Sequence, residues 1–149
     1  MKFLGRLSFI LSLPLLRAYL RRSRRAYGLI VCGNEVVLVK GWLGRQKWQF
    51  PGGGTRHGET SPETIVREIK EEVGLDIDSK SLKYIGSGRW QTDGLGHDYD
   101  LYLCKFPSKK SLKTRRPELI GAAWVKVSDL DATNCSSEII EALHKVNLL

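Results

Sequence analysis

Four glutamates, Glu59, Glu68, Glu71 and Glu72, lie within 14 residues of sequence, shortly after the glycine run Gly52–Gly54. Three of them fall within about one turn of a helix, and like charges at i,i+4 destabilise an isolated helix by about 0.2–0.5 kcal/mol per pair. A sequence that gathers carboxylates in this way predicts a cation that compensates them. Carboxylate oxygens suit a hard ion, so we expect Mg²⁺, with Mn²⁺ as the alternative.

The segment after this glycine run carries the start and stop signals of a helix. Thr60 or Ser61 can serve as the N-cap, and Pro62 suits the first turn. Gly74 is typical of the residue that ends a helix in the left-handed conformation. We therefore predict a helix between these signals.

Two faces separate on this predicted helix. Ile65, Ile69 and Val73 share one side, whereas the three helical glutamates form a stripe about 120° away. The apolar side is expected to pack on a sheet. The acidic side is expected to present its carboxylates to solvent or to a ligand.

Short β-rich runs surround the helix. The predicted strands are Tyr27–Cys32, Glu35–Lys40, Lys47–Phe50, Leu82–Trp90, Tyr99–Phe106 and Ala122–Val127, and a last helix runs from Glu138 to about Val146. Gly33 and Asn34 are typical of a hairpin turn, and His97 is expected in a loop. Because strands and helices do not alternate regularly, we predict an α/β fold of the α+β type, with a mixed sheet packed between helices.

The net charge of +8 is unevenly distributed. Residues 1–25 carry seven basic and no acidic side chains, whereas the remaining chain holds 17 basic and 16 acidic ones. The near-neutral body argues against a nucleic-acid-binding surface, and no specific nucleic-acid partner is expected. A second basic run, Lys105–Arg116, reads as a solvated loop or as a contact with an anionic substrate or lipid.

Residues 1–25 are expected to form a segment apart from a domain over residues 26–149. The charge-free run Leu7–Leu16 is ten residues long, about half of what a spanning helix needs, and Pro14 interrupts it. On a helical wheel most basic residues cluster on one side, which is typical of a helix on an anionic membrane surface. Packing on the domain or on a partner chain, and a signal or spanning segment, are the alternatives.

The expected location is the cytoplasm, with the protein peripheral on the inner face of the membrane if the segment is an anchor. Arginines on the C-terminal side of the segment favour this orientation. The three cysteines, Cys32, Cys104 and Cys135, are far apart and form no C-x-x-C pair. We read them as reduced thiols rather than zinc ligands.

The acidic segment resembles the Nudix box, G-x5-E-x7-R-E-U-x-E-E-x-G-U, in which U is aliphatic. Every fixed position of that motif is matched, by Gly53, Glu59, Arg67, Glu68, Ile69, Glu71, Glu72, Gly74 and Leu75. The pattern from Tyr27 to about Val146 is also similar to a Nudix domain. The resemblance implies an α/β/α sandwich in which the motif forms a loop, a helix and a loop.

The resemblance also implies a reaction. Nudix hydrolases cut a nucleoside diphosphate linked to another group, by attack of water on phosphorus with divalent metal ions. Glu68 and Glu72 would be metal ligands together with the carbonyl of Gly52, and Glu71 would be a further ligand or assist the base. Arg67 would orient a neighbouring carboxylate, Glu59 would brace the loop, and Gly53 and Gly74 would shape the motif.

The general base is open, because family members take it from the motif or from a downstream acid. Glu118 matches a downstream position and is our candidate for a ligand or base, with Asp93, Asp98 and Asp100 as rivals. For substrate binding we select Arg45, Trp48 and Arg89, since cations contact phosphate and aromatic rings stack on bases.

The substrate is a nucleotide-type small molecule whose identity is open. Residues after the box carry none of the marks that the family shows for NADH, ADP-ribose, dinucleoside polyphosphates or coenzyme A. A (d)NTP, a nucleotide sugar and an RNA 5′ end remain. The competing hypothesis is a membrane-associated Nudix-fold module that binds a ligand without turnover. The oligomeric state is open, with a homodimer as one option.

Overall fold

The structure is a computed structural model that describes residues 24–41, 47–92, 95–114 and 119–149. Four predictions fall outside these ranges: the behaviour of the first 23 residues, Arg45 as a phosphate contact, Glu118 as a ligand or base, and Asp93 as a rival for the base. They remain predictions. None of the helices in the described ranges is long and apolar enough to cross a membrane.

A six-stranded mixed sheet forms the centre of the domain. Its strands are β1 (Arg25–Cys32), β2 (Glu35–Gly41), β3 (Gly52–Gly54), β4 (Lys83–Thr92), β5 (Leu95–Lys105) and β6 (Leu119–Lys126). The order across the sheet is β4-β5-β1-β2-β6, and β3 also pairs with β1. Only the β1–β5 pair is parallel among these pairings, so the mixed sheet expected from the sequence is confirmed.

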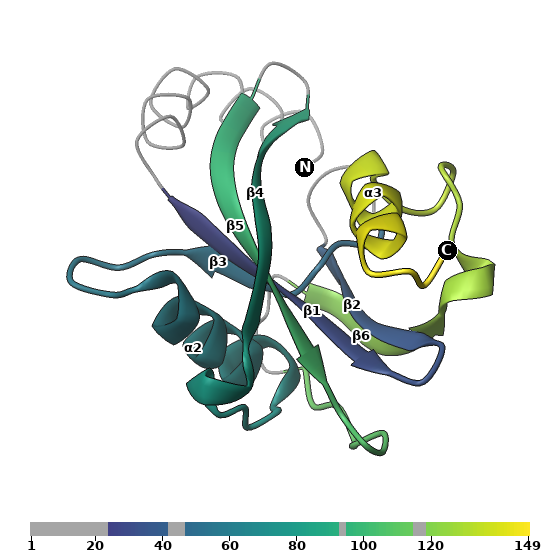
Figure 1. Ribbon diagram of the computed structural model, residues 1–149, viewed down its shortest axis with the longest axis horizontal. Coiled ribbons are helices and arrows are strands. Elements are labelled where there is room, and N and C mark those ends of the chain that lie inside the picture. Colours follow the sequence, from purple (N-terminus) through teal and green to yellow (C-terminus); the bar gives the residue numbers. More distant parts are fainter. Residues whose placement is uncertain (1–23, 42–46, 93–94, 115–118) are drawn as a thin grey trace, which may run out of the picture.

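Two α-helices, α2 (Ser61–Val73) and α3 (Ser137–Lys145), lie on opposite sides of the strands (Figure 1). Two short 3-10 helices, Ser79–Ser81 and Val127–Asp129, complete the described elements. Because successive residues of a strand point to opposite faces, β1 contributes to two cores. Ala26 and Ile30 pack with α2, whereas Leu29 and Val31 pack with α3.

Helix α2 begins and ends as the sequence predicts. Thr60 is the N-cap, and it forms a reciprocal capping box with Glu63. Gly74 ends the helix at φ 74°, in the left-handed region that glycine adopts without strain. Ile65, Ile69 and Val73 are fully buried, and each such side chain contributes about 1.5–3 kcal/mol relative to an exposed one. This burial fixes the acidic side of α2 relative to the sheet.

The structure corrects one predicted strand. Lys47–Phe50 is not a strand and makes only isolated bridges, Trp48 with Cys135 and Gln49 with Val39. The strand lies instead in the glycine run, where β3 pairs antiparallel with Arg25–Tyr27 of β1. Glycines suit this position because a Cβ on Gly52 would lie 2.2 Å from the carbonyl oxygen of Ala26.

Several strand boundaries also differ from the prediction. Strand β1 begins at Arg25, two residues earlier than expected, β5 begins at Leu95 rather than at Tyr99, and β6 begins at Leu119 rather than at Ala122. His97 is therefore a strand residue and not a loop residue. From His97 to Leu103, buried and exposed residues do not alternate strictly along β5, so the strand pattern is weak. The glycines before this stretch also concealed the start of the strand.

Candidate active site

Glu68 and Glu72 lie against the glycine strand β3. The backbone N–H of Gly52 donates to Oε2 of Glu72 at 2.9 Å. A Cβ on Gly53 would stand 2.6 Å from the carboxyl carbon of Glu68, so the missing side chain of Gly53 makes room for that carboxylate. Both glutamates are buried, with 3% and 7% of their surface exposed. The acidic side of α2 thus faces β3 rather than open solvent.

Arg67 pairs with Glu59, Glu68 and Glu71, three of the four glutamates of the motif. Its guanidinium holds Glu59 through two hydrogen bonds, of 2.6 Å and 2.9 Å, and also donates to Glu68 and to the carbonyl of Gly54. The nearer oxygen of Glu71 lies 3.6 Å away. A buried carboxylate is costly unless it is paired and hydrogen-bonded, and this arginine provides both conditions. The five residues Glu59, Arg67, Glu68, Glu71 and Glu72 are called the carboxylate cluster below.

Glu59 ties the loop before α2 to the helix. Besides Arg67, it accepts hydrogen bonds from the backbone N–H of Arg56 at 2.9 Å and from the hydroxyl of Thr64 at 3.1 Å. The bonds from Arg67 lower the pKa of Glu59 to about 2, despite the opposing effect of burial. Hydrogen bonding to Glu59 and Glu68 raises the pKa of Arg67 further, so the pair stays charged.

Glu71 is the member of the cluster that solvent reaches most easily. Its side chain is 35% exposed, against 4% for Glu68. It faces two arginines, because the guanidinium of Arg56 lies 3.4 Å from its other oxygen. An accessible carboxylate can accept a proton from water or bind a hydrated ion.

The donor set of the cluster fits a hard divalent ion. Buried Glu68 and Glu72 are one helical turn apart, and both lie against β3, where the carbonyl of Gly52 is the predicted backbone ligand. Within the described residues no three acidic, histidine or cysteine side chains are grouped closely enough to hold a metal ion by themselves. Mg²⁺ does not need such a group, because it commonly binds through one or two carboxylates, waters and substrate phosphates.

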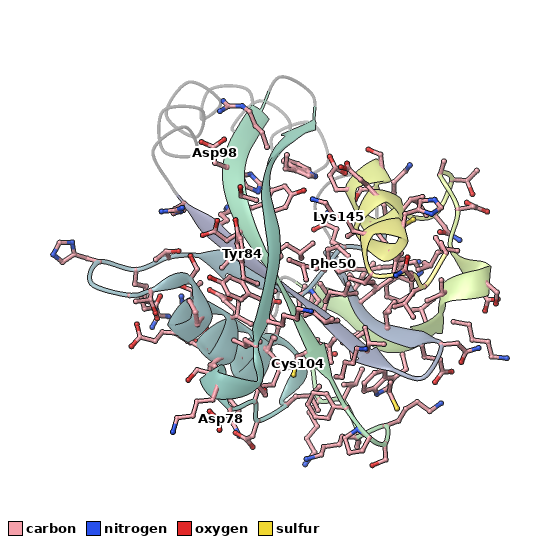
Figure 2. The ribbon with its side chains drawn as sticks, viewed as in Figure 1. Phe50, Asp78, Tyr84, Asp98, Cys104 and Lys145 are labelled. Carbon is pink, nitrogen blue, oxygen red and sulfur yellow. The ribbon has the colours of Figure 1, made fainter. Side chains whose placement is uncertain are left out.

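The residues predicted to bind substrate are distributed unevenly. Trp48 packs on the core of the α3 face, with Nζ of Lys40 lying 4.3 Å from its ring centroid. Arg89 forms an exposed ion pair of 3.0 Å with Asp98, which lies toward the tip of the β4–β5 hairpin (Figure 2). Asp100, a rival for the general base, is buried and accepts a hydrogen bond from Ser61 at 2.6 Å. None of these contacts places Trp48, Arg89 or Asp100 in the carboxylate cluster.

A second group of side chains, which the sequence did not reveal, lies on the α3 face of the sheet. Tyr27, Trp90, His97 and Tyr99 are in ring contact and are called the aromatic cluster below. They come from β1, β4 and β5, and Trp90 pairs directly with His97 across the hairpin. His97, Tyr99 and Leu101 occupy every second position of one strand and therefore share a face. This spacing is the sequence signal that could have indicated the cluster.

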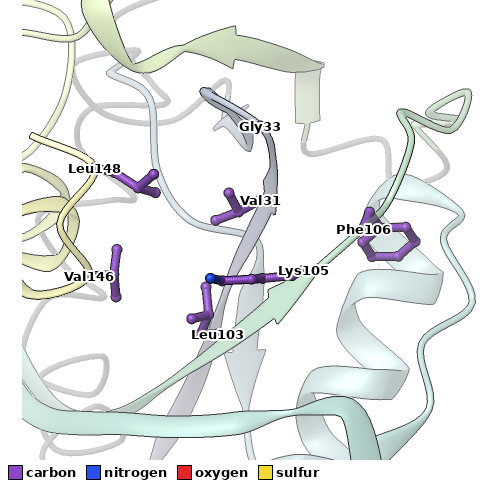
Figure 3. Close-up of a pocket in the computed structure, with 7 residues that line it drawn as sticks. All are labelled: Val31, Gly33, Leu103, Lys105, Phe106, Val146 and Leu148. Atoms are coloured by element: carbon purple, nitrogen blue, oxygen red, sulfur yellow. The ribbon is translucent and has the colours of Figure 1, made fainter.

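A hollow of about 230 Å³ lies elsewhere, at the other end of β1 (Figure 3). Its walls are Val31, Gly33, Leu103, Lys105, Phe106, Val146 and Leu148. Lys105 is the one charged residue of this lining, and no carboxylate of the cluster contributes to it. The hollow is therefore separate from the place where the acidic chemistry is concentrated.

Residues 22–143 match the family model of the NUDIX domain. This chain belongs to the Nudix hydrolase family. The resemblance carried by the acidic motif is thereby confirmed over most of the chain, and the hydrolase class is favoured over a binding module without turnover. Hydrolases of this family generally use divalent metal ions, in agreement with the donor set.

Named relatives give a finer comparison. The chain is 43% identical over 121 residues to an RNA pyrophosphohydrolase of Pseudoalteromonas translucida, a match that covers 68% of this chain and 70% of that protein. It is 33% identical over 94 residues to one of Nitratiruptor sp., covering 56% of this chain and 61% of the relative. For the latter, the chain thus spans less than two thirds of the relative's length.

Solved structures support the same fold. A MutT NUDIX hydrolase from Burkholderia pseudomallei has a TM-score of 0.72 at 19% identity, covering 83% of this chain and 97% of that one. The NUDIX domain of Shewanella oneidensis NrtR, complexed with ADP ribose, also has a TM-score of 0.72, at 11% identity, over 83% of this chain and 85% of its own. At such low identity these two matches establish the fold alone.

Proposed function

We propose that the chain hydrolyses a phosphoanhydride bond in a nucleoside 5′-polyphosphate, with Mg²⁺ as the metal and Mn²⁺ as the alternative. The observation that carries the proposal is the carboxylate cluster. Buried Glu68 and Glu72 are fixed against a glycine strand whose backbone a phosphate chain can approach closely. When bound, the metal would neutralise phosphate charge and lower the pKa of the attacking water.

The chain's own residues have distinct roles in this proposal. Glu68 and Glu72 hold the metal together with the carbonyl of Gly52. Arg67 fixes Glu68 and Glu59, so the ligands are oriented before substrate arrives. Glu71 takes the proton of the attacking water, since its carboxylate is the most accessible of the cluster; Glu118 is the alternative base. The water oxygen bonds to phosphorus as the bridging P–O bond breaks.

The names of the relatives favour RNA as the first substrate to test. Those proteins are RNA pyrophosphohydrolases, and an RNA 5′ end is one of the three substrate classes that the sequence left open. The proposed substrate is therefore a 5′-triphosphate on RNA, from which pyrophosphate or phosphate is released. This proposal runs against the expectation that no nucleic acid is bound.

A substrate panel tests both parts of the proposal, the hydrolytic reaction and RNA as the substrate. The wild-type protein is incubated with 5′-triphosphorylated RNA, free nucleoside triphosphates and a nucleotide sugar, with and without Mg²⁺, and the products are identified. We expect metal-dependent release of pyrophosphate or phosphate, with RNA turned over fastest. Faster turnover of a free nucleotide would overturn the RNA assignment but not the reaction.

Two variants control this assay. Glu72→Gln keeps an oxygen that can accept from Gly52 but removes the charge, and we expect kcat/KM to fall about 10²–10³-fold. Asp129→Asn, at an exposed acid in the 3-10 helix after β6, should leave kcat/KM unchanged. If Glu72→Gln retained full activity with a normal circular dichroism spectrum, the carboxylate cluster would not be the catalytic site.

We also propose that residues 1–25 bind an anionic membrane surface, on the strength of their charge and apolar pattern alone. Arg24, within this segment, pairs with Asp100 at 3.2 Å, so the segment joins the domain directly. In a co-sedimentation assay, the full chain should pellet with vesicles that contain phosphatidylserine. A full-length R17E, R21E and R22E variant should stay in the supernatant, and equal pelleting of both would remove the proposal.

A further inference from the structure

His97 has a buried nitrogen that no described group satisfies. The residue is only 4% exposed, and its Nδ1 lacks a hydrogen-bond partner. Buried side-chain nitrogens are nearly always paired, because an unpaired one loses its bond to water without replacement. A ligand atom is one partner that would remove this cost.

The surroundings of His97 keep its imidazole uncharged. Burial, together with the positive charges of Arg25 and Arg89 and against the opposing effect of Asp98, lowers the pKa of His97 to about 4. The ring of Trp90 stacks on it at 5.0 Å between centroids. A neutral imidazole has one donor and one acceptor nitrogen, so the identity of the unsatisfied nitrogen depends on the tautomer.

Tyr27 decides the tautomer. Its hydroxyl lies 2.9 Å from Nε2 of His97. The positive charge of Arg25 lowers the pKa of Tyr27, against the larger rise that burial causes, and this makes the hydroxyl a better donor. Because an imidazole nitrogen is also a better acceptor than a phenol oxygen, the Tyr27 hydroxyl donates to Nε2. Nε2 is then the acceptor, and Nδ1 carries the unsatisfied N–H.

Tyr27 links His97 to the carboxylate cluster through the sheet. Tyr27 pairs with Gly52 across β1 and β3, and a Cβ on Gly52 would lie 2.8 Å from its ring. The charges of Glu72 and Glu68 both act on its hydroxyl. The side chain of Tyr27 thus connects His97 to β3, the strand against which Glu68 and Glu72 lie.

The neighbourhood suits a planar ring better than a second phosphate. Trp90 and Tyr99 offer aromatic surface, and Trp90 is only partly buried, so a rotation of its indole would open the ring edge of His97. Glu138 and Glu141 of α3 add negative charge beside Tyr99, whose pKa they raise after the larger effect of burial. Carboxylates at this place disfavour an anion.

We propose that His97 is a specificity-determining residue, which donates a hydrogen bond from Nδ1 to a ring carbonyl of the substrate's nucleobase. The inference rests on the proposed function for the reaction itself but assigns a new contact on the opposite face of the sheet. A purine with a 6-oxo group offers the required acceptor, whereas a 6-amino group presents a second donor at the same place. The site therefore prefers oxo-purines to adenine.

The test compares inosine and adenosine 5′-triphosphates, which differ at this group. We expect the wild-type kcat/KM to favour inosine at least about fivefold. His97→Phe keeps an aromatic ring without nitrogens and should bring the ratio close to one, mainly by a loss on inosine. His144→Phe, on the exposed side of α3, should keep the wild-type ratio. An unchanged ratio in His97→Phe overturns the proposal, and so does an equal loss on both nucleotides and on inorganic tripolyphosphate.

A binding measurement separates this proposal from the reaction. With ¹⁵N-labelled histidine in the full chain, Nδ1 of His97 should show the protonated tautomer, and its resonance should shift with inosine monophosphate but much less with adenosine monophosphate. This result would hold even if the protein turned over neither triphosphate. Turnover without a shift at His97 would leave the reaction standing and overturn the assignment of the base contact.

Discussion

The carboxylate cluster and the aromatic cluster lie on opposite faces of the same sheet, but they are built in different ways. The first comes from one continuous stretch, β3 to α2, and Arg67 inside the cluster compensates only part of the negative charge of its four glutamates. The second is assembled from β1, β4 and β5, and its histidine is kept neutral. The charged site is thus local and keeps an excess of negative charge, whereas the uncharged one depends on strands far apart in the sequence.

Removing the internal cation should have the largest effect. Arg67→Ala leaves Glu68 buried without its arginine, and breaking a buried pair in this way costs about 3–5 kcal/mol. Urea unfolding should show this loss in the free energy of unfolding, together with loss of activity. Arg89→Ala removes an arginine from an exposed pair on the hairpin and should cost less than about 1 kcal/mol. Equal losses in the two variants would show that Arg67 does not stabilise the buried carboxylates.

The neutral histidine should leave a mark on the pH dependence of stability. The pKa of His97 is about 4 in the folded protein and about 6.5 when unfolded, so the unfolded state binds a proton first as the pH falls. Stability that is present above pH ~6.5 is therefore lost progressively down to pH ~4, by up to about 3 kcal/mol. His97→Phe should flatten this part of the unfolding profile, whereas His144→Phe should not.

Two adjacent glycines test how tightly β3 and α2 fit together. A Cβ on Gly53 would contact the carboxylate of Glu68, whereas nothing lies within 4 Å of one on Gly54. Gly53→Ala should therefore cost about 1–3 kcal/mol by overpacking and should lower activity. Gly54→Ala should change the free energy of unfolding by less than about 0.5 kcal/mol. Thermal melts and the nucleotide assay should be run on both variants. Equal melting temperatures and equal activities would show that β3 and α2 do not fit tightly at Gly53.

Glu59 should give the smallest effect, in a lower pH window than that of His97. Its folded pKa of about 2 is below the unfolded value of about 4.5, so its stabilisation is present above pH ~4.5 and is lost as the pH falls toward 2. We expect about 1 kcal/mol, because the pair with Arg67 is partly open to solvent. Glu59→Gln should remove this dependence below pH 4.5 and leave the window of His97 unchanged. A change in the pH range over which His97 affects stability would mean that the carboxylate cluster and the aromatic cluster influence each other.

The same contrast explains what the sequence could predict. The helix α2, its caps and the spacing of its glutamates depend on residues within a few turns, so local patterns described them correctly. The position of Glu68 against Gly53 could not be read in this way, because it depends on β3 pairing with β1. The glycines looked like a turn, since glycine is disfavoured in strands. The approach of the Ala26 carbonyl explains Gly52, and the Glu68 carboxylate explains Gly53.

The aromatic cluster was not predicted for a related reason. His97 follows Gly94 and Gly96, which are typical of a loop, and the strand around it is set by pairing with β4. The hydrogen bond of its Nε2 could not be predicted from local sequence either, because the partner, Tyr27, is 70 residues away in sequence and 2.9 Å away in space. Arg45 and Glu118 remain predictions, since both lie outside the described residues.

Strand β1 alternates between the two faces, and this has an evolutionary consequence. Ala26 and Ile30 hold the helix that carries the catalytic acids, while Arg25 and Tyr27 reach the neighbourhood of the base contact. Because neighbours along a strand face opposite ways, a substitution at Arg25 can alter which base is preferred without disturbing the packing beneath α2. The fold thus allows substrate preference to diverge by single steps while the hydrolytic machinery stays unchanged.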